Sequence, residues 1–151
     1  MEAIGALATL SELWYLSAVS YGPFPTMLPG EFEEYRLQRE FFIDVILLAP
    51  AEAQLHITSD SWQGIPSLLG KRMIERDGEW IVVLRPENKD FLVWKALTNN
   101  LQSKFVHFFL LHEGTEIVAS YDGMCMVILD ERFPSYPLLI ERHDSFLSLM
   151  E

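Results

Sequence analysis

The sequence predicts a single-domain α+β fold, in which three or four helices pack mainly on one face of an antiparallel β-sheet of five to seven strands. Acid-glycine pairs at Asp77-Gly78, Glu113-Gly114 and Asp122-Gly123 separate short apolar runs, as tight turns between antiparallel strands do. Longer segments repeat apolar residues at helical intervals. The 151 residues are 50% hydrophobic, so residues 1–151 can form one core.

The first two predicted elements are helices. Thr9-Leu-Ser-Glu12 matches a capping box, in which each side chain accepts a hydrogen bond from a free backbone N–H at the helix start, and Gly22-Pro23 would end that helix. A second helix is predicted from near Gly30 to Pro50, with glutamates in the first turn, where the helix dipole favours carboxylates. Its residues 41–48, FFIDVILL, also fit a buried strand, but the continuous helical spacing favours the helix.

Strands and one helix are predicted for the middle of the chain. Residues 54–59 alternate in the manner of a strand, and residues 71–85 form a hairpin around Asp77-Gly78. The connector between them has room for one helical turn. Arg85-Pro86 ends the hairpin, and apolar residues then recur at helical intervals from Asn88 to Asn99-Asn100.

The stretch HEGTEIVASYDGMC, residues 112–125, brings acidic residues, a histidine and the single cysteine close together in the sequence. It is either a catalytic or metal-binding cluster or a pair of turns that join three strands. The turns are favoured, because each glycine supplies the positive φ that tight turns require. A meander over residues 105–130 then separates the two turns by a central strand more than about 20 Å long. A last helix is predicted from Pro134 or Pro137.

The formal net charge is −11, which disfavours nucleic acid and anionic membranes as partners, because both need a basic footprint. One cysteine permits no internal disulfide, in keeping with a reducing compartment. The apolar N-terminus lacks the basic start of a signal peptide and is interrupted by Glu2 and Glu12, so it is a poor membrane span. We therefore expect a cytoplasmic protein, in which the acidity serves either solubility or recognition.

No catalytic, cofactor-binding or metal-binding residues are predicted. His107 and His112 are five residues apart on one predicted strand and point to opposite faces, which cannot chelate one metal ion. Residues 64–72, GIPSLLGKR, lack both the spacing of a phosphate-binding loop and its Ser or Thr. Cys125, between two methionines, is interpreted as a small core side chain rather than a nucleophile. The absence of a recognisable catalytic motif disfavours an enzyme without excluding one built from dispersed residues, and no cofactor is expected.

These features favour a small acidic protein-binding module. One specific form is an immunity-type inhibitor of a basic toxin or nuclease, because opposite charges steer association. Two alternatives stay open. A small-molecule-binding protein or enzyme would use an aromatic-lined pocket between sheet and helices, with Trp62, Trp80, Trp94 and the histidines in its lining. A homo-oligomeric structural subunit, such as a homodimer, would associate through a sheet edge or the first helix.

Two signals identify candidate partner-binding residues. Trp62 is a large aromatic in a polar setting, which is typical either of an interface anchor or of a plug at the edge of the core. The surplus of carboxylates would meet a basic partner. The candidates are Glu31, Glu33, Glu34, Asp60, Trp62, Glu113 and Glu116.

Overall fold

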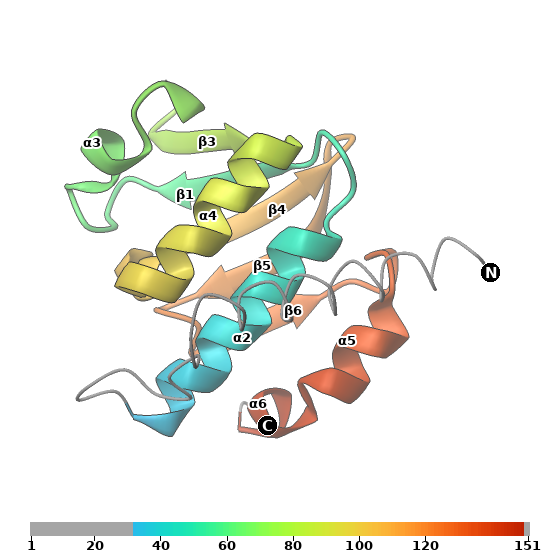
Figure 1. Cartoon of the computed structure of the whole chain (residues 1–151). Helices are drawn as coiled ribbons and strands as arrows, with labels where there is room; N and C mark the ends of the chain where they lie inside the picture. Colours follow the sequence, from blue (N-terminus) through green and yellow to red (C-terminus); the bar gives the residue numbers. More distant parts are fainter. Residues whose placement is uncertain (1–31, 150–151) are drawn as a thin grey trace.

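The computed structural model describes residues 32–149 of the chain (Figure 1). The helix predicted after Thr9 and the candidate residue Glu31 lie outside the described residues. The elements in chain order are α2 (Glu33–Leu48), β1 (Gln54–Thr58), α3 (Ile65–Leu69), the 3-10 helix η1 (Gly70–Arg72), β2 (Met73–Arg76), β3 (Glu79–Val83), α4 (Pro86–Asn99), the 3-10 helix η2 (Leu101–Lys104), β4 (Phe108–His112), β5 (Thr115–Tyr121), β6 (Met126–Leu129), α5 (Tyr136–Arg142) and α6 (Asp144–Ser148).

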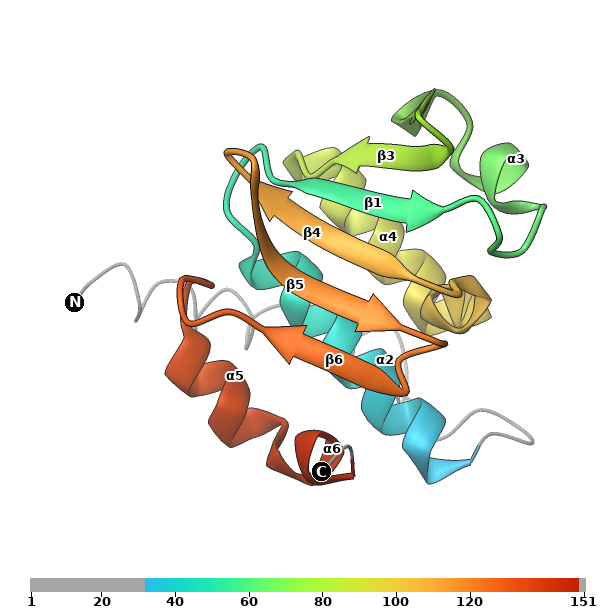
Figure 2. The ribbon, with the colours of Figure 1, turned by 180° about the vertical axis from the view of Figure 1, so that it is seen from behind.

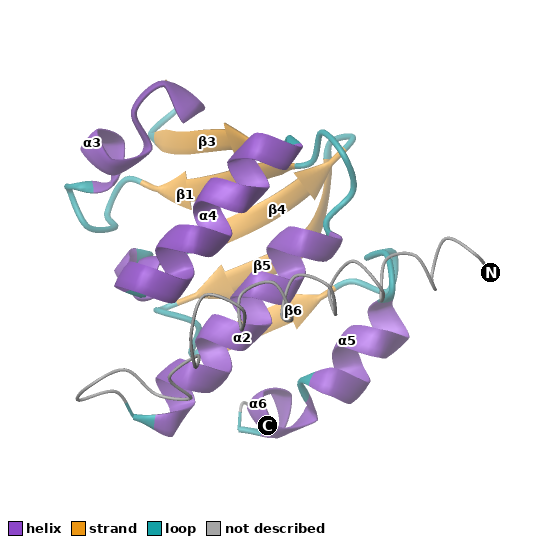
Figure 3. Ribbon diagram, viewed as in Figure 1, coloured by secondary structure: helices purple, strands orange, loops and turns teal. Residues whose placement is uncertain are grey.

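The predicted fold class is confirmed: the chain has an α+β fold with one antiparallel sheet. Its six strands lie in the order β2-β3-β1-β4-β5-β6, and every neighbouring pair is antiparallel. The part of the chain that the structure describes contains five α-helices, of which α3 and α6 have five residues each. Figure 3 shows α2 and α4 lying across the same face of the sheet, as the sequence predicts.

The predicted turns are present. Asp77 and Gly78 have φ of 53° and 77°, and Glu113 and Gly114 have φ of 52° and 77°, so both turns use two left-handed residues. Residues 122–124 form the third turn, between β5 and β6, and all have positive φ. The stretch from residue 112 to 125 is therefore two turns at opposite ends of β5, and its polar groups are dispersed.

Residues 41–48 are helical and complete α2. Residues 41–46 are all nearly inaccessible to solvent, because α2 packs on the sheet and also contacts α4 on one side and α5 and α6 on the other. A helix buried on most of its circumference reads as a continuous apolar run, which is why the segment also resembled a strand.

The core lies between the sheet and this helical layer. Alternate side chains of the central strands point into it, among them Leu55, Ile57, Val82 and Leu110, which are fully buried. Phe42 of α2 meets Phe105 and Phe108 edge-on, with ring centroids 5.8 and 5.6 Å away. These aromatic contacts fix α2 over β4.

A buried contact between an aspartate and a histidine attaches the C-terminal helices to α2. The Asp44 carboxylate of α2 is fully buried, and its Oδ2 atom lies 2.7 Å from Nε2 of His143. The sequence predicted one last helix with His143 on it; instead, His143 lies between α5 and α6. Its ring packs edge-on against Phe41 at 5.3 Å, and Phe41 also contacts Phe146 at 5.1 Å. Arg142 Nε is 3.4 Å from the same carboxylate oxygen.

Replacing His143 by leucine should lower the free energy of unfolding by about 3 kcal/mol. The variant leaves the Asp44 carboxylate buried without its closest partner, while Arg142 retains part of the pairing. Urea denaturation measures the change. Glu141→Gln, an exposed change on α5, is the control and should alter stability by less than about 0.5 kcal/mol. A His143→Leu protein as stable as the unchanged chain would contradict this role for the pair.

Candidate functional site

The predicted partner-binding residues do not form one surface. Glu33 and Glu34 are exposed in the first turn of α2, and Glu33 pairs with Arg36 at 2.7 Å. Asp60 and Trp62 lie in the connection between β1 and α3, and Glu113 lies in the turn at the opposite end of the sheet (Figure 1). The remaining candidate is Glu116, paired with Leu111 across β5 and β4.

The sheet face opposite α2 and α4 is not covered by any helix among residues 32–149. Figure 2 shows this face: the strands lie in front, with α2 and α4 behind them and α5 and α6 beyond the β6 edge. The residues on this face alternate with the core residues along each strand. What they present to solvent is therefore the second surface of the sheet.

A row of mainly apolar residues crosses this face from edge to edge. Its members are direct cross-strand partners, one from each strand in sheet order. They are Ile74, Ile81, His56, Phe109, Ala119 and Ile128. At the two edges of the row, Ile74 and Ile128 are each 55% exposed. We name this set the apolar row.

The middle of the apolar row is already packed by its neighbours. Ile81 is 2% exposed and His56 is 8% exposed. His56 Nε2 lies 3.0 Å from Oε1 of Gln54, and its Nδ1 lies 3.5 Å from a carboxylate oxygen of Glu79. The polar contacts of His56 are therefore made within the face, which leaves a firm surface rather than an open cavity.

A second group of side chains extends the face at the β6 side. Met126, opposite Tyr121, is 53% exposed. Tyr121 meets the rings of Phe109 and His107, with centroids 5.5 and 5.7 Å away. The exposed surface of β4, β5 and β6 therefore continues the apolar row with an aromatic cluster.

Carboxylates lie at the end of the face near His107. The Nδ1 atom of His107 accepts the backbone N–H of Asp122 at 3.1 Å, so in the neutral ring Nε2 carries the proton. That Nε2 faces Asp60 Oδ2 at 3.8 Å and Asp122 Oδ1 at 4.0 Å. The fold thus brings the predicted candidate Asp60 close to Asp122, although the two are 62 positions apart in the sequence.

Asp130 and Arg132 follow β6 and close another side of the face. Arg132 Nε and Nη2 donate to the two carboxylate oxygens of Asp130 at 2.7 and 2.8 Å, and the backbone N–H of Arg132 donates to Oδ1 at 2.8 Å. These hydrogen bonds, led by those of the guanidinium, lower the pKa of Asp130 to about 2. The same pairing raises the pKa of Arg132.

Trp62 is a surface residue, 52% exposed, and not a plug of the core. Its indole lies flat on Gly64: a Cβ atom at Gly64 would be 2.2 Å from the ring. Lys104 Nζ lies 5.7 Å from the ring centroid, and the Trp62 backbone N–H donates to the Lys104 carbonyl at 3.0 Å. Trp62 is therefore held in one orientation although half of it faces solvent.

Other sequence predictions of chemistry have mixed outcomes. Cys125 is exposed, so its interpretation as a core residue was wrong: in the turn after β5 it is Met124, 2% exposed, that points inward. His107 precedes β4 rather than belonging to the strand of His112. Within residues 32–149, no three His, Cys, Asp or Glu side chains are grouped so as to hold a metal ion. Nor does any helix of that range have the length and apolar character to cross a membrane.

The three tryptophans proposed for an aromatic pocket differ in burial, and so they do not line one pocket. Trp80 is 4% exposed and belongs to the core, whereas Trp62 and Trp94 are 52% and 55% exposed. The apolar row was not predicted from the sequence, although one signal could have revealed it. The strands VASY and MVIL have apolar residues at both alternating positions, which indicates a sheet with two apolar faces.

Comparison with protein-family models, with curated proteins and with solved structures gives no match for this chain in any of the three.

The Asp130 carboxylate should titrate with a midpoint of about 2, measured by NMR of its side-chain carbon as the pH is lowered. Arg132→Gln should bring this midpoint back toward the ordinary 3.8, because the strongest hydrogen bonds to the carboxylate are lost. The pKa is depressed in the folded chain, so the stabilisation is present above pH 3.8 and is lost as pH falls through about 2. An unchanged midpoint in Arg132→Gln would contradict the pairing.

Gly64→Ala should displace the Trp62 indole from Gly64 and expose more of it to solvent. The added methyl would lie 2.2 Å from the ring, and the exposed end of the side chain can rotate away. We expect a tryptophan fluorescence change that is absent in a Trp62→Phe background. The loss of stability should stay near about 1 kcal/mol, as for a surface change. Loss of several kcal/mol would mean that the ring supports the core.

Proposed function

We propose that this protein is a protein-binding module that docks a basic partner on the uncovered face of its sheet. The observation that carries the proposal is the apolar row, which crosses six strands and ends in two isoleucines, each 55% exposed. Exposed apolar patches larger than a few hundred Å² mark interaction sites on soluble domains, and Met126 and Ile128 of β6 and Ile74 of β2, each more than half exposed, would form the contact points of such a site.

The dimensions of the face suit a protein surface better than a small ligand. Five inter-strand spacings of about 4.8 Å give a width of about 24 Å, and strands of about five residues give a length of about 17 Å. The flat area of about 400 Å² is about half of what one partner contributes to a standard interface. A partner seated on the row would therefore also contact the rim.

The rim supports a partner of opposite charge. Asp60, Asp122 and Glu116 lie at the ends of the face, and the whole chain carries a formal charge of −11. Of the cations at this face, Arg132 is paired with Asp130 and Arg76 lies opposite Glu79, whereas Lys71, Arg72 and Arg85 form a basic group beside Ile74 at the β2 edge. A second copy would bring another −11 toward the same face and be repelled, whereas a basic protein would be attracted.

A basic toxin or nuclease, neutralised as by an immunity protein, is the specific partner class that this charge favours. The acidic rim would accelerate encounter, and the apolar row would supply the contact that slows dissociation. Trp62, 52% exposed and two residues after Asp60 in the β1–α3 connection, would extend that contact.

The double variant Ile74→Glu, Ile128→Glu tests the proposal. The wild-type chain, immobilised, is used to isolate its partner from the cells that produce it, and the affinity of the purified pair is then measured. The double variant should bind about 30-fold more weakly or worse, because it places charges on the contact surface. Raising the ionic strength should slow association with the wild-type chain.

Trp94→Glu is the matched control, because Trp94 is also 55% exposed but belongs to α4, on the covered side of the sheet. It should bind the partner as the wild-type chain does. Equal binding by the double variant and the wild type would contradict the proposal, as would loss of binding in Trp94→Glu alone. A wild-type chain that is dimeric by light scattering, with a monomeric double variant, would make the occupant a second copy.

A further inference from the structure

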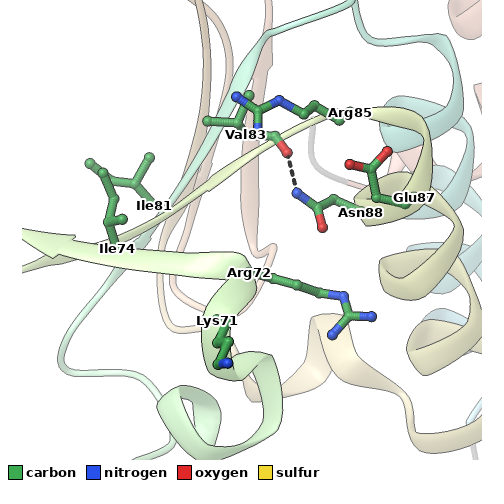
Figure 4. A pocket seen from close by; sticks show the side chains of 8 residues that line it. All are labelled: Lys71, Arg72, Ile74, Ile81, Val83, Arg85, Glu87 and Asn88. Atoms are coloured by element: carbon green, nitrogen blue, oxygen red, sulfur yellow. Dashed lines mark hydrogen bonds between the residues drawn. The ribbon is translucent and has the colours of Figure 1, made fainter.

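A basic hollow lies beside the β2 edge of the sheet, where the hairpin meets the start of α4 (Figure 4). Its volume is about 490 Å³, within the range of small-molecule sites. It is lined by Lys71, Arg72, Ile74, Ile81, Val83, Arg85, Glu87 and Asn88. These residues come from η1, both strands of the hairpin and the first turn of α4, together with Arg85, which immediately precedes α4.

The lining is cationic in a chain that is strongly acidic overall. Lys71, Arg72 and Arg85 give three positive charges against the single carboxylate of Glu87, a net +2. Arg72 is positioned by stacking on the ring of Phe91, 4.0 Å from its centroid, which leaves the edge of the guanidinium able to donate. Arg85 has one ionic neighbour, Glu52, at 3.5 Å, and its side chain is 55% exposed.

The start of α4 adds to this field. Pro86 is the first residue of this 14-residue helix, and no side chain caps its N-terminus. The Asn88 and Lys89 N–H groups both donate to the Arg85 carbonyl, while Asn88 Nδ2 donates to the Val83 carbonyl at 2.8 Å. Asn88 is 9% exposed, so its amide is fixed in the wall of the hollow. The helix dipole therefore points its positive end toward the three cations.

An aliphatic wall completes the hollow. Ile81 is buried, Val83 is half-buried, and Ile74 is largely exposed at the edge strand. A ligand with an apolar body could pack on these side chains while its charged group meets the cations. Inorganic phosphate would bind the cations but would make no contact with the aliphatic wall.

We propose that this hollow binds a small organic anion: a phosphate monoester or a carboxylate attached to a compact apolar or aromatic body. Binding at this site can be tested on the isolated chain, without a partner. Ile74 and Ile81 of its wall also belong to the apolar row, so a partner docked there would cover part of the hollow. It adds a ligand-binding activity to a chain whose other predicted surfaces are acidic or apolar.

Titration of the purified, ¹⁵N-labelled chain tests the site. Phenyl phosphate and benzoate are the organic probes, inorganic phosphate is the probe without a body, and benzyl alcohol is the probe without a charge. The organic anions should produce saturable shifts in the backbone amides of residues 71, 72, 87 and 88. Inorganic phosphate should bind more weakly than phenyl phosphate, and benzyl alcohol should not bind at the cations. The stronger of the two organic anions identifies the ligand as a phosphate or a carboxylate.

Arg72→Gln and Arg85→Gln should each lower the affinity for the stronger-binding organic anion by about tenfold, because each removes a charge-assisted contact. Arg132→Gln removes one positive charge at the far edge of the sheet and should leave the affinity unchanged; the same spectra verify that every variant is folded. Absence of saturable binding would overturn the proposal. So would shifts spread over all basic residues, or an Arg132→Gln effect as large as that of Arg85→Gln.

Discussion

The burial of α2 on almost all sides is the constraint on which the rest of the structure depends. The helix lies between the sheet, α4 and the C-terminal helices, with residues 41–46 nearly inaccessible. Lys89 of α4 donates to the carbonyl of Ala49 at 2.6 Å, just beyond the end of α2, although burial lowers the pKa of its ammonium group. On the side of α2 away from α4, Asp44 contacts His143, which joins α5 to α6. Each neighbouring helix is thus anchored to α2 by a polar contact as well as by apolar packing.

This arrangement commits the described helices to one side of the sheet. A six-stranded sheet has two faces, and α2 and α4 cover one of them (Figure 2). The other face keeps apolar side chains that burial would stabilise by about 25 cal/mol per Å². The proposed function rests on this imbalance: a partner that covered the apolar row would provide the burial that α2 and α4 do not provide on this face. Acidic side chains at the rim favour a basic protein in that place.

The sequence was informative wherever local geometry decides the outcome. The acid-glycine pairs Asp77-Gly78 and Glu113-Gly114 favour the left-handed backbone of a two-residue turn. Each hairpin could therefore be predicted from two residues. Contacts between residues far apart in the sequence could not be predicted. Nothing local indicates that Asp44 meets a histidine 99 positions away, or that Asp60 joins Asp122 around one imidazole. The exposed Cys125 shows the same limit: residues 122–124 of the preceding turn are all left-handed, and in this turn the side chain of Met124 rather than that of Cys125 is buried.

Methionine oxidation tests the central claim most directly, namely that this face is bare in the free chain and covered in the complex. Met126, 53% exposed on the face, and Met124, 2% exposed in the preceding turn, form an internal comparison two residues apart. With dilute peroxide, mass spectrometry should find Met126 oxidised much faster than Met124 in the free chain, and protected when the isolated partner is bound. Equal, slow oxidation of both in the free chain, or no protection of Met126 in the complex, would contradict the account.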